Sequence, residues 1–157
     1  MGERFLKSIR LLADCLQSYE RLSGQYVRQS GLTHAQFDII ATLGNTPGMS
    51  YKELGDKTLI TKGTLTGVIE RLEQKGLVER QRNDCDKRSF FVRLTAEGEQ
   101  VFCNVFPKVV KESGKVFAHY SEDDFAALEK TLTDLKTVIT AGHTECPSTH
   151  DSTKEII

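Results

Sequence analysis

The sequence predicts a mainly helical fold that carries one small β-hairpin. Through most of the chain, apolar residues recur three or four positions apart, which is the spacing of the buried face of an α-helix. Two short runs, residues 77–82 and 90–94, are instead rich in strand-forming residues and flank a polar loop. Two short helical segments precede this hairpin, and longer helical segments lie at both ends of the chain.

The N-terminal part of the chain is expected to form two helices. The first spans about residues 2–29, where apolar and aromatic residues from Phe5 to Tyr26 recur at helical spacing. Thr33 begins the second helix, because Gln36 three residues later completes a capping box. The run GNTPG that follows ends it, since glycine and proline interrupt regular structure.

The central part is expected to form a helix–turn–helix followed by the hairpin. Ser50 and Glu53 form a second capping box at the start of a short helix. After a turn, another helix begins near Thr61 and ends at Gly76, which suits the position just beyond a C-cap. The buried face of this helix is Leu65, Val68, Ile69 and Leu72. A helix–turn–helix followed by a hairpin is the winged form of a DNA-reading module.

The C-terminal part is expected to form two more helices. Thr95 begins one that runs towards Tyr120, and Ser121 with Asp124 begins the next. The residues after these helices lack periodicity and are expected to be mobile. The expected organisation is one domain with a tail: 1–141 for the domain, about 33–95 for the winged-helix core, about 2–29 and 96–141 for the flanking helices, and 142–157 for the tail.

Length and composition exclude several classes of protein. A chain of 157 residues with 38% hydrophobic residues can bury one substantial core. No apolar run reaches the roughly 20 residues that cross a bilayer, and the N-terminus has no secretory signal, so a cytoplasmic location without membrane attachment is expected. The chain contains no P-loop, G-x-S-x-G, H-E-x-x-H or glycine-rich dinucleotide motif. We therefore expect neither enzymatic activity nor a cofactor.

Charge is distributed unevenly along the chain. Residues 57–93 contain nine basic and five acidic side chains, a local charge of +4, whereas the whole chain carries −1. A basic block on an acidic body is typical of a surface that binds an anionic partner. Charge alone does not distinguish such a surface from an ordinary solvated one.

The helix from Lys62 to Lys75 is the first candidate DNA-contacting element. With its apolar stripe buried, Gly63 and Gly67 point outward, where each glycine costs roughly 1 kcal/mol relative to alanine. Exposed glycines allow another surface to approach closely, although a neutral surface helix can also carry them. Small hydroxyls and the positive end of the helix suit phosphate groups and base edges. The candidate DNA-binding residues of this element are Thr61, Lys62, Gly63, Thr64, Thr66, Gly67, Glu70 and Arg71.

The loop of the hairpin is the second candidate. Arg82, Lys87 and Arg88 supply positive charge, and Asp86 can orient the Arg88 guanidinium. An arginine at a hairpin tip fits the narrow minor groove, whereas an isolated charged loop is more often only a solvated turn. Its position directly after a helix–turn–helix favours contact with DNA.

The run from Gly63 to Gly98 resembles the recognition helix and wing of the MarR family of winged-helix transcription regulators. The residues that carry the resemblance are RL at 71–72, KGLVER at 75–80, DKR at 86–88, LT at 94–95 and Gly98 itself. The D-x-R wing followed by LT and glycine is fairly specific, and the resemblance covers nearly the whole chain. It implies that Arg88 is the wing arginine with Asp86 as its partner, and that residues 61–71 face the major groove.

The resemblance also implies a homodimer on a pseudo-palindromic operator of double-stranded DNA, with the helices of about 2–29 and 96–141 forming the dimer. The apolar stripes of these helices agree with this, although they can also pack on each other within one chain. Family members commonly act as repressors that a small phenolic or anionic effector, or thiol oxidation, releases from DNA.

Cys15 is the candidate redox residue, since it lies near the reactive cysteine of the peroxide-sensing branch of the family. Its position beside the apolar stripe favours a buried structural cysteine instead, and Cys103 is also expected to be structural. In the tail, His143, Cys146 and His150 lack an obvious fourth ligand, so we expect no metal site.

A function of a different class stays open. A winged helix can serve only as a protein-interaction module without DNA binding, and the exposed glycine face suits a partner helix as well as a DNA groove. The local charge of +4 argues for DNA, but it does not exclude this alternative.

Overall fold

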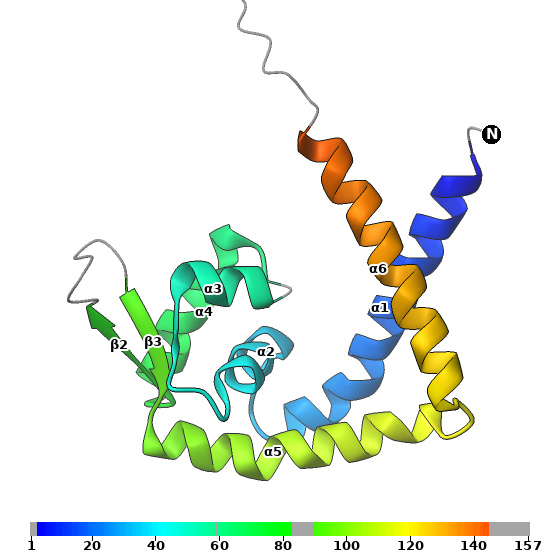
Figure 1. Ribbon diagram of the computed structural model, residues 1–157. Helices are drawn as coiled ribbons and strands as arrows, with labels where there is room; N and C mark the ends of the chain where they lie inside the picture. Colours follow the sequence, from blue (N-terminus) through cyan, green and yellow to red (C-terminus); the bar gives the residue numbers. More distant parts are fainter. Residues whose placement is uncertain (1–2, 59, 83–89, 145–157) are drawn as a thin grey trace, which may run out of the picture. The chain divides into compact units, whose positions relative to one another are not determined.

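The computed structural model describes residues 3–58, 60–82 and 90–144, without the side chains of Lys62, Arg82, His143 and Thr144 (Figure 1). The chain divides into two compact units, Met1–Lys115 and Val116–Ile157. The elements are α1 (Arg4–Gln29), α2 (His34–Leu43), β1 (Met49–Ser50), α3 (Tyr51–Lys57), α4 (Lys62–Gln74), β2 (Val78–Arg82), β3 (Phe90–Leu94), α5 (Ala96–Gly114), the 3-10 helix η1 (Lys115–Phe117) and α6 (Glu122–Thr144). The mainly helical fold with a small antiparallel sheet is confirmed. Among the described helices, none is long and apolar enough to cross a membrane.

Side-chain caps begin the helices of the first unit where the sequence predicts them. At α2, Gln36 N donates to Thr33 Oγ1 at 3.2 Å, and Thr33 N donates to Gln36 Oε1 at 3.1 Å. Ser50 and Glu53 form the same reciprocal pair at the start of α3. Each box supplies acceptors to backbone donors that have none within the helix, so both helix starts follow from local sequence.

The core of the first unit determines which face of α4 is exposed. The stripe predicted for α4 is confirmed, since no member is more than 3% exposed: Leu65, Val68, Ile69 and Leu72. They belong to one cluster with Ile39 of α2, Leu54 of α3 and Val92 of β3, which are also buried. Burying one such side chain stabilises a fold by about 1.5–3 kcal/mol, and this holds the opposite face of α4 outward.

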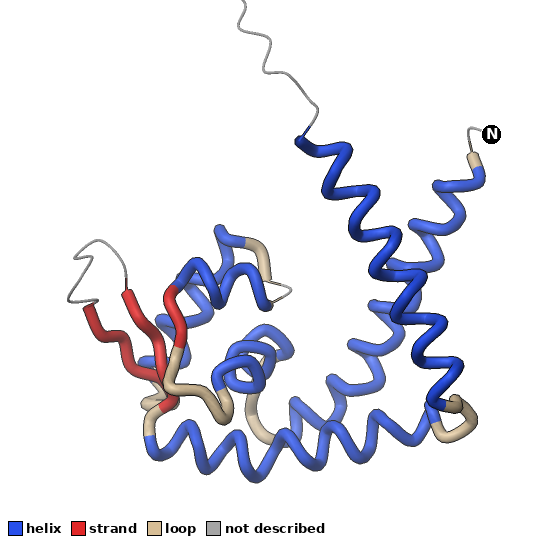
Figure 2. Tube along the Cα trace, in the orientation of Figure 1, coloured by secondary structure: helices blue, strands red, loops and turns tan. Residues whose placement is uncertain are grey.

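The sheet of the first unit has three antiparallel strands in the order β1–β3–β2 (Figure 2). β2 and β3 form the predicted hairpin, in which Arg82 lies opposite Phe90. The sequence does not predict β1, because two residues are too short for the alternation typical of a strand. β1 forms because Gly48, at φ +113°, lets the chain pass close to β3. A Cβ on Gly48 would lie 2.5 Å from the ring of Phe91.

The turn after α4 packs against the start of α5. Gly76 has φ +71°, and Leu77 N donates to Leu72 O at 3.0 Å, which is the Schellman pattern. Thr95 caps α5, and its hydroxyl donates to Gly76 O at 2.6 Å. Gly98 lies directly against this turn, because a Cβ there would be 2.0 Å from Leu77 O. The LT-x-x-G sequence therefore connects the end of the hairpin to the turn where the hairpin begins.

α5 ends earlier than predicted. The sequence predicts a helix that runs towards Tyr120, whereas α5 ends at Gly114 and the 3-10 helix η1 follows. Glycine is a weak helix former, so a helix ends there at little cost. In the second unit, the ring of Tyr120 packs against Phe117 and Phe125 with centroid distances of 5.7 and 5.3 Å. This aromatic cluster stabilises a turn where the prediction has a continuous helix.

α6 is the main element of the second unit. It follows a capping box in which Asp124 N donates to Ser121 Oγ at 3.2 Å and Ser121 N donates to Asp124 Oδ2 at 2.9 Å. α6 extends to Thr144, so residues 142–144 are helical where the sequence predicts a tail. The rest of the predicted tail, residues 145–157, lies outside the described residues.

Candidate nucleic-acid interface

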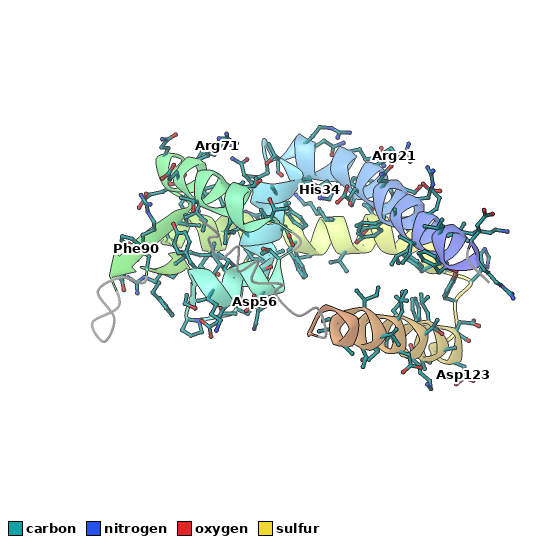
Figure 3. All side chains as sticks on the ribbon, turned by 90° about the horizontal axis from the view of Figure 1, so that it is seen from above. Arg21, His34, Asp56, Arg71, Phe90 and Asp123 are labelled. Atoms are coloured by element: carbon teal, nitrogen blue, oxygen red, sulfur yellow. The ribbon has the colours of Figure 1, made fainter. Side chains whose placement is uncertain are left out.

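The outward face of α4 and the residue before it bring together most of the residues predicted to contact DNA. Those exposed are Thr61, Gly63, Thr64, Thr66, Glu70 and Arg71, and Gly67 is half-buried. Figure 3 shows Arg71 projecting outward from α4. A Cβ on Gly63 or Gly67 would meet no described atom within 4 Å, so packing inside the chain requires neither glycine. Lys62 lies at the start of α4, but its side chain is outside the described part of the chain.

The N-terminus of α4 keeps hydrogen-bond donors available. Thr61 is the N-cap residue, but its hydroxyl accepts no bond from the helix backbone and lies 3.0 Å from the Thr64 hydroxyl. Thr64 N donates to the carbonyl oxygen of Thr61 at 2.9 Å, so the available donors of the first turn are the N–H groups before it, those of Lys62 and Gly63. Together with the two hydroxyls and the positive end of the helix dipole, these N–H groups can bind a phosphate oxygen.

Arg80 of β2 connects α4 with the hairpin, and sequence reasoning did not identify it as a site residue. Its guanidinium pairs with Glu73, lies 3.9 Å from Glu70, and sits over the ring of Phe90 with 5.8 Å to the centroid. The hydrogen bond to Glu73 raises the pKa of Arg80. Glu70, predicted to read bases, therefore has a cation beside its carboxylate. The sequence does contain a signal for this ion pair. Glu70 and Glu73 are three positions apart on one helix face, and Arg80 follows on the next strand.

Other cations of the basic block also have partners within the protein. Arg93 pairs with Glu79, the residue opposite it on β2. Lys75 Nζ donates to the carbonyl oxygen of Gly31 at 2.8 Å. These contacts reduce the number of basic groups that are free to bind a phosphate. Four predicted wing contacts lie outside the described residues and stay predictions: the side chain of Arg82, and Asp86, Lys87 and Arg88.

A cavity of about 480 Å³ lies beside the N-terminus of α4. It is lined by Leu16, Tyr19, Glu20, Ser23, His34, Ala35, Phe37, Asp38, Ile60, Thr61, Thr64 and Val109. A cavity with apolar and aromatic walls and a few polar groups suits a small organic molecule. Thr61 and Thr64 belong both to this cavity and to the predicted DNA contacts. Sequence reasoning missed the cavity, because its residues come from separate segments with no common spacing.

Figure 3 labels His34 on α2, and the hydrogen bonds of this residue define which ring nitrogen carries a proton. Its Nε2 lies 3.0 Å from the carbonyl oxygen of Glu20 and 3.0 Å from Ser23 Oγ. A carbonyl oxygen only accepts, and Ser23 donates its own proton to the carbonyl oxygen of Tyr19 at 2.9 Å. His34 Nε2 must therefore be the donor, which leaves Nδ1 as an acceptor in the neutral ring.

Cys15 and Cys103 are free thiols, and both are exposed. The expectation that Cys15 is buried within the chain is wrong, and Cys103, which was expected to be structural, is exposed as well. The buried residues of α1 all lie between Ser23 and Val27, well after Cys15. Cys103 follows the buried Phe102, and one residue along a helix turns the side chain by about 100° away from the core.

Similarity to known proteins agrees with this geometry. Residues 32–90 match the MarR family. The HTH-type transcriptional regulator MhqR of Bacillus subtilis (strain 168) is 27% identical over 124 residues, which cover 79% of this chain and 86% of that relative. The HTH-type transcriptional regulator SarZ of Staphylococcus haemolyticus (strain JCSC1435) is 31% identical over 109 residues, which cover 68% of this chain and 71% of that relative.

A solved structure shows the same arrangement of elements. The crystal structure of NadR in complex with 4-hydroxyphenylacetate matches with a TM-score of 0.69 and 26% sequence identity. The match covers 79% of this chain and 88% of that chain. These similarities extend well beyond the segment that the family match covers.

Proposed function

This chain belongs to the MarR family of winged-helix transcription regulators, and on that premise we propose that it is a homodimeric repressor released by a small ligand. The chain is a DNA-binding transcription regulator. Repression, dimerisation and release are the proposal, and a regulator of this kind would act in the cytoplasm. The observation that carries the proposal is that Thr61 and Thr64 are exposed candidate DNA contacts and also line the adjacent cavity.

In this proposal, α4 enters the major groove of DNA. The exposed glycines, Gly63 and Gly67, allow close approach, and the N-terminus of the helix binds a phosphate. Glu70, with Arg80 beside it, can accept a hydrogen bond from the amino group of a cytosine, and Arg71 can donate to a guanine. Selectivity would therefore come from the outward face of α4.

The wing would supply much of the affinity. In this proposal Arg82, Lys87 and Arg88 would contact phosphates and the minor groove, and Asp86 would orient Arg88. We expect Arg88→Ala to weaken binding to operator and random duplex alike, and to lower the slope of log affinity against log salt by about 1. Filter binding at several salt concentrations measures both quantities. Unchanged affinity for both duplexes at moderate salt would refute the role of Arg88.

Dimerisation is proposed from the apolar side chains that the terminal helices expose. On α1 the following are at least 41% exposed: Phe5, Leu6, Ile9, Leu11, Leu12, Leu16 and Tyr19. On α6 the exposed apolar side chains are Leu128, Leu132, Val138 and Ile139. Apolar surface on this scale is unusual for a monomer, and a second copy would cover it.

A symmetric dimer places two recognition helices about one helical turn apart on DNA, which suits a pseudo-palindromic operator. Sedimentation velocity at micromolar concentration tests the oligomeric state. The proposed dimer would be contradicted if the protein sediments as a monomer and binds a palindromic duplex as a monomer.

Release by a ligand is proposed from the cavity beside α4. NadR has been solved with 4-hydroxyphenylacetate, which supports a small aromatic effector for this related chain. A ligand in the cavity would contact Thr61 and Thr64 from inside the protein and could shift the N-terminus of α4. Since the same segment is proposed to bind phosphate, a ligand-bound state with a displaced N-terminus would bind DNA less tightly.

Thiol oxidation is an alternative route to release, because the Cys15 thiol is exposed and accessible to an oxidant. Peroxide treatment that abolishes DNA binding in the parent protein but not in a Cys15→Ser variant would support oxidation. Loss of binding in both proteins would assign the effect to other residues.

Use of the winged helix only for protein interaction is the remaining alternative. A gel shift with the DNA upstream of its own gene distinguishes the two functions. Retention of that DNA by a dimer, lost as salt is raised, is the expected result. Failure to retain it at low salt would favour the interaction module.

A further inference from the structure

We infer that the C-terminal turn of α4, residues 74–77, sets the direction in which this helix points toward DNA, with Lys75 as a positioning residue and not a phosphate contact. This inference rests on the proposed entry of α4 into the major groove. Hydrogen bonds from two other parts of the fold meet at this turn. The outward face nearer the N-terminus stays open, since a Cβ on Gly63 or Gly67 would meet no described atom within 4 Å.

Lys75, the C-cap residue of α4, is bonded to the junction between α1 and α2. Its Nζ donates to the carbonyl oxygen of Gly31 at 2.8 Å and to Gln36 Oε1 at 3.4 Å. Gly31 follows α1 with φ +73°, and Gln36 belongs to the capping box that begins α2 and is only 4% exposed. An ammonium group has three N–H groups to donate, so two of those on Lys75 already have acceptors within the chain.

The same turn is also bonded to the start of α5. Thr95 donates to it twice, from its hydroxyl to Gly76 O at 2.6 Å and from its N–H to Leu77 O at 3.1 Å. The turn therefore cannot shift relative to α1 or α5 without breaking hydrogen bonds. Both helices belong to the segments proposed to form the dimer, so this turn connects the dimer-forming part of the chain with α4.

These hydrogen bonds supply a direction that apolar packing does not. The buried stripe determines which face of α4 points outward, but apolar burial is non-directional and resists a small tilt only weakly. A helix of 13 residues is about 20 Å long, so a tilt of about 6° around its C-terminal turn moves its N-terminus by about 2 Å. A hydrogen bond to a base edge does not survive that displacement, whereas a long basic side chain can still reach a phosphate. Loss of the Lys75 contacts should therefore reduce selectivity more than general affinity.

The test measures, by fluorescence anisotropy, the affinity of the full-length protein for the DNA upstream of its own gene and for a random duplex of the same length. Lys75→Met removes the donor but keeps a long side chain. It should lower the affinity for the upstream DNA at least about fivefold, a difference of about 1 kcal/mol, and that for the random duplex less than about twofold. Lys75→Gln is a second neutral variant with the same expected result. Lys75→Arg keeps a charged donor and should retain the preference for upstream DNA.

Lys57→Met is the matched control, because Lys57 ends α3 and contributes the same charge to the same basic block. It should leave the ratio of the two affinities unchanged. Circular dichroism confirms that each variant is folded at the assay temperature.

Equal losses of Lys75→Met on both duplexes, with a slope of log affinity against log salt lower by about 1, would overturn the inference, because Lys75 would then contact a phosphate. An unchanged ratio would also overturn it, whether or not the variant unfolds at a lower temperature, since the role of Lys75 would then be structural only. Failure of the proposed function gives a different result. In that case the parent protein itself does not retain the upstream DNA at low salt, and this refutes the inference together with the function on which it rests.

Discussion

Replacing Arg80 with alanine should loosen the hairpin from α4 and weaken DNA binding. The side chains of Arg80 and Glu73 are 28% and 35% exposed, so solvent screens this ion pair only in part. A surface pair contributes about 0–1 kcal/mol, and the guanidinium over the Phe90 ring adds about 0.5–1 kcal/mol. The expected loss in the free energy of unfolding for Arg80→Ala is therefore about 0.5–2 kcal/mol.

Arg93 offers a matched control on the same two strands. It pairs with Glu79 across the hairpin, their side chains are 46% and 43% exposed, and this pair involves no residue of α4. Arg93→Ala should cost at most about 0.5 kcal/mol. Urea unfolding followed by circular dichroism measures both variants, and equal losses would refute the view that Arg80 connects the hairpin with α4.

The same two variants separate positioning from charge in DNA binding. Each removes one positive charge, so a purely electrostatic effect on affinity should be shared. Arg80→Ala also removes the cation beside Glu70, whose carboxylate then faces the phosphates without compensation. We expect Arg80→Ala to lose about fivefold more affinity than Arg93→Ala, measured by anisotropy well below the unfolding temperature. Equal affinities for the two variants would mean that Arg80 has no positioning role.

Three further predictions concern the glycines and the capping box. Gly98→Ala should lower the free energy of unfolding by about 1–3 kcal/mol, because its Cβ would lie 2.0 Å from Leu77 O, and thermal unfolding measures this. Gly63→Ala should stabilise the fold by up to about 1 kcal/mol yet weaken DNA binding, and undiminished affinity would contradict close approach at this position. Hydrogen bonds from Ser50, first from its backbone N–H, lower the pKa of the Glu53 carboxylate below its ordinary value of 4.5. The ionised carboxylate therefore stabilises the fold above pH 4.5. This stabilisation is lost as the pH falls through the lowered pKa of the folded state. Urea midpoints of Glu53→Gln should lack this acid-dependent part, and an unchanged pH profile would show that the carboxylate contributes nothing.

The helices and the hairpin could be predicted because their signals are local. Ser50 and Glu53 are three residues apart, and the four buried positions of α4 follow one helical period. The same period predicts the exposed face, so Gly63, Thr66 and Arg71 point outward as expected. The predicted end of α5 was wrong because the helical pattern of apolar residues continues past Gly114. The aromatic contacts that stabilise the turn are made by residues after Gly114.

Contacts between segments that are far apart in the sequence could not be predicted from such local patterns. β1 depends on the close approach of Gly48 to Phe91, and the Arg80 contact depends on how β2 lies against α4. Exposure of Cys15 depends on how much of α1 the rest of the chain covers. Such features require the relative positions of segments, which spacing along one segment does not contain.

Sequence patterns were sufficient for the family resemblance, for α4 and for its outward face, since backbone geometry repeats every few residues and local side chains set where a helix begins and ends. The cavity beside α4, the proton on His34 Nε2 and the cation beside Glu70 emerged only once the chain was folded. Each of them depends on groups from separate elements within a few ångströms of one another, and packing of the whole core sets those distances.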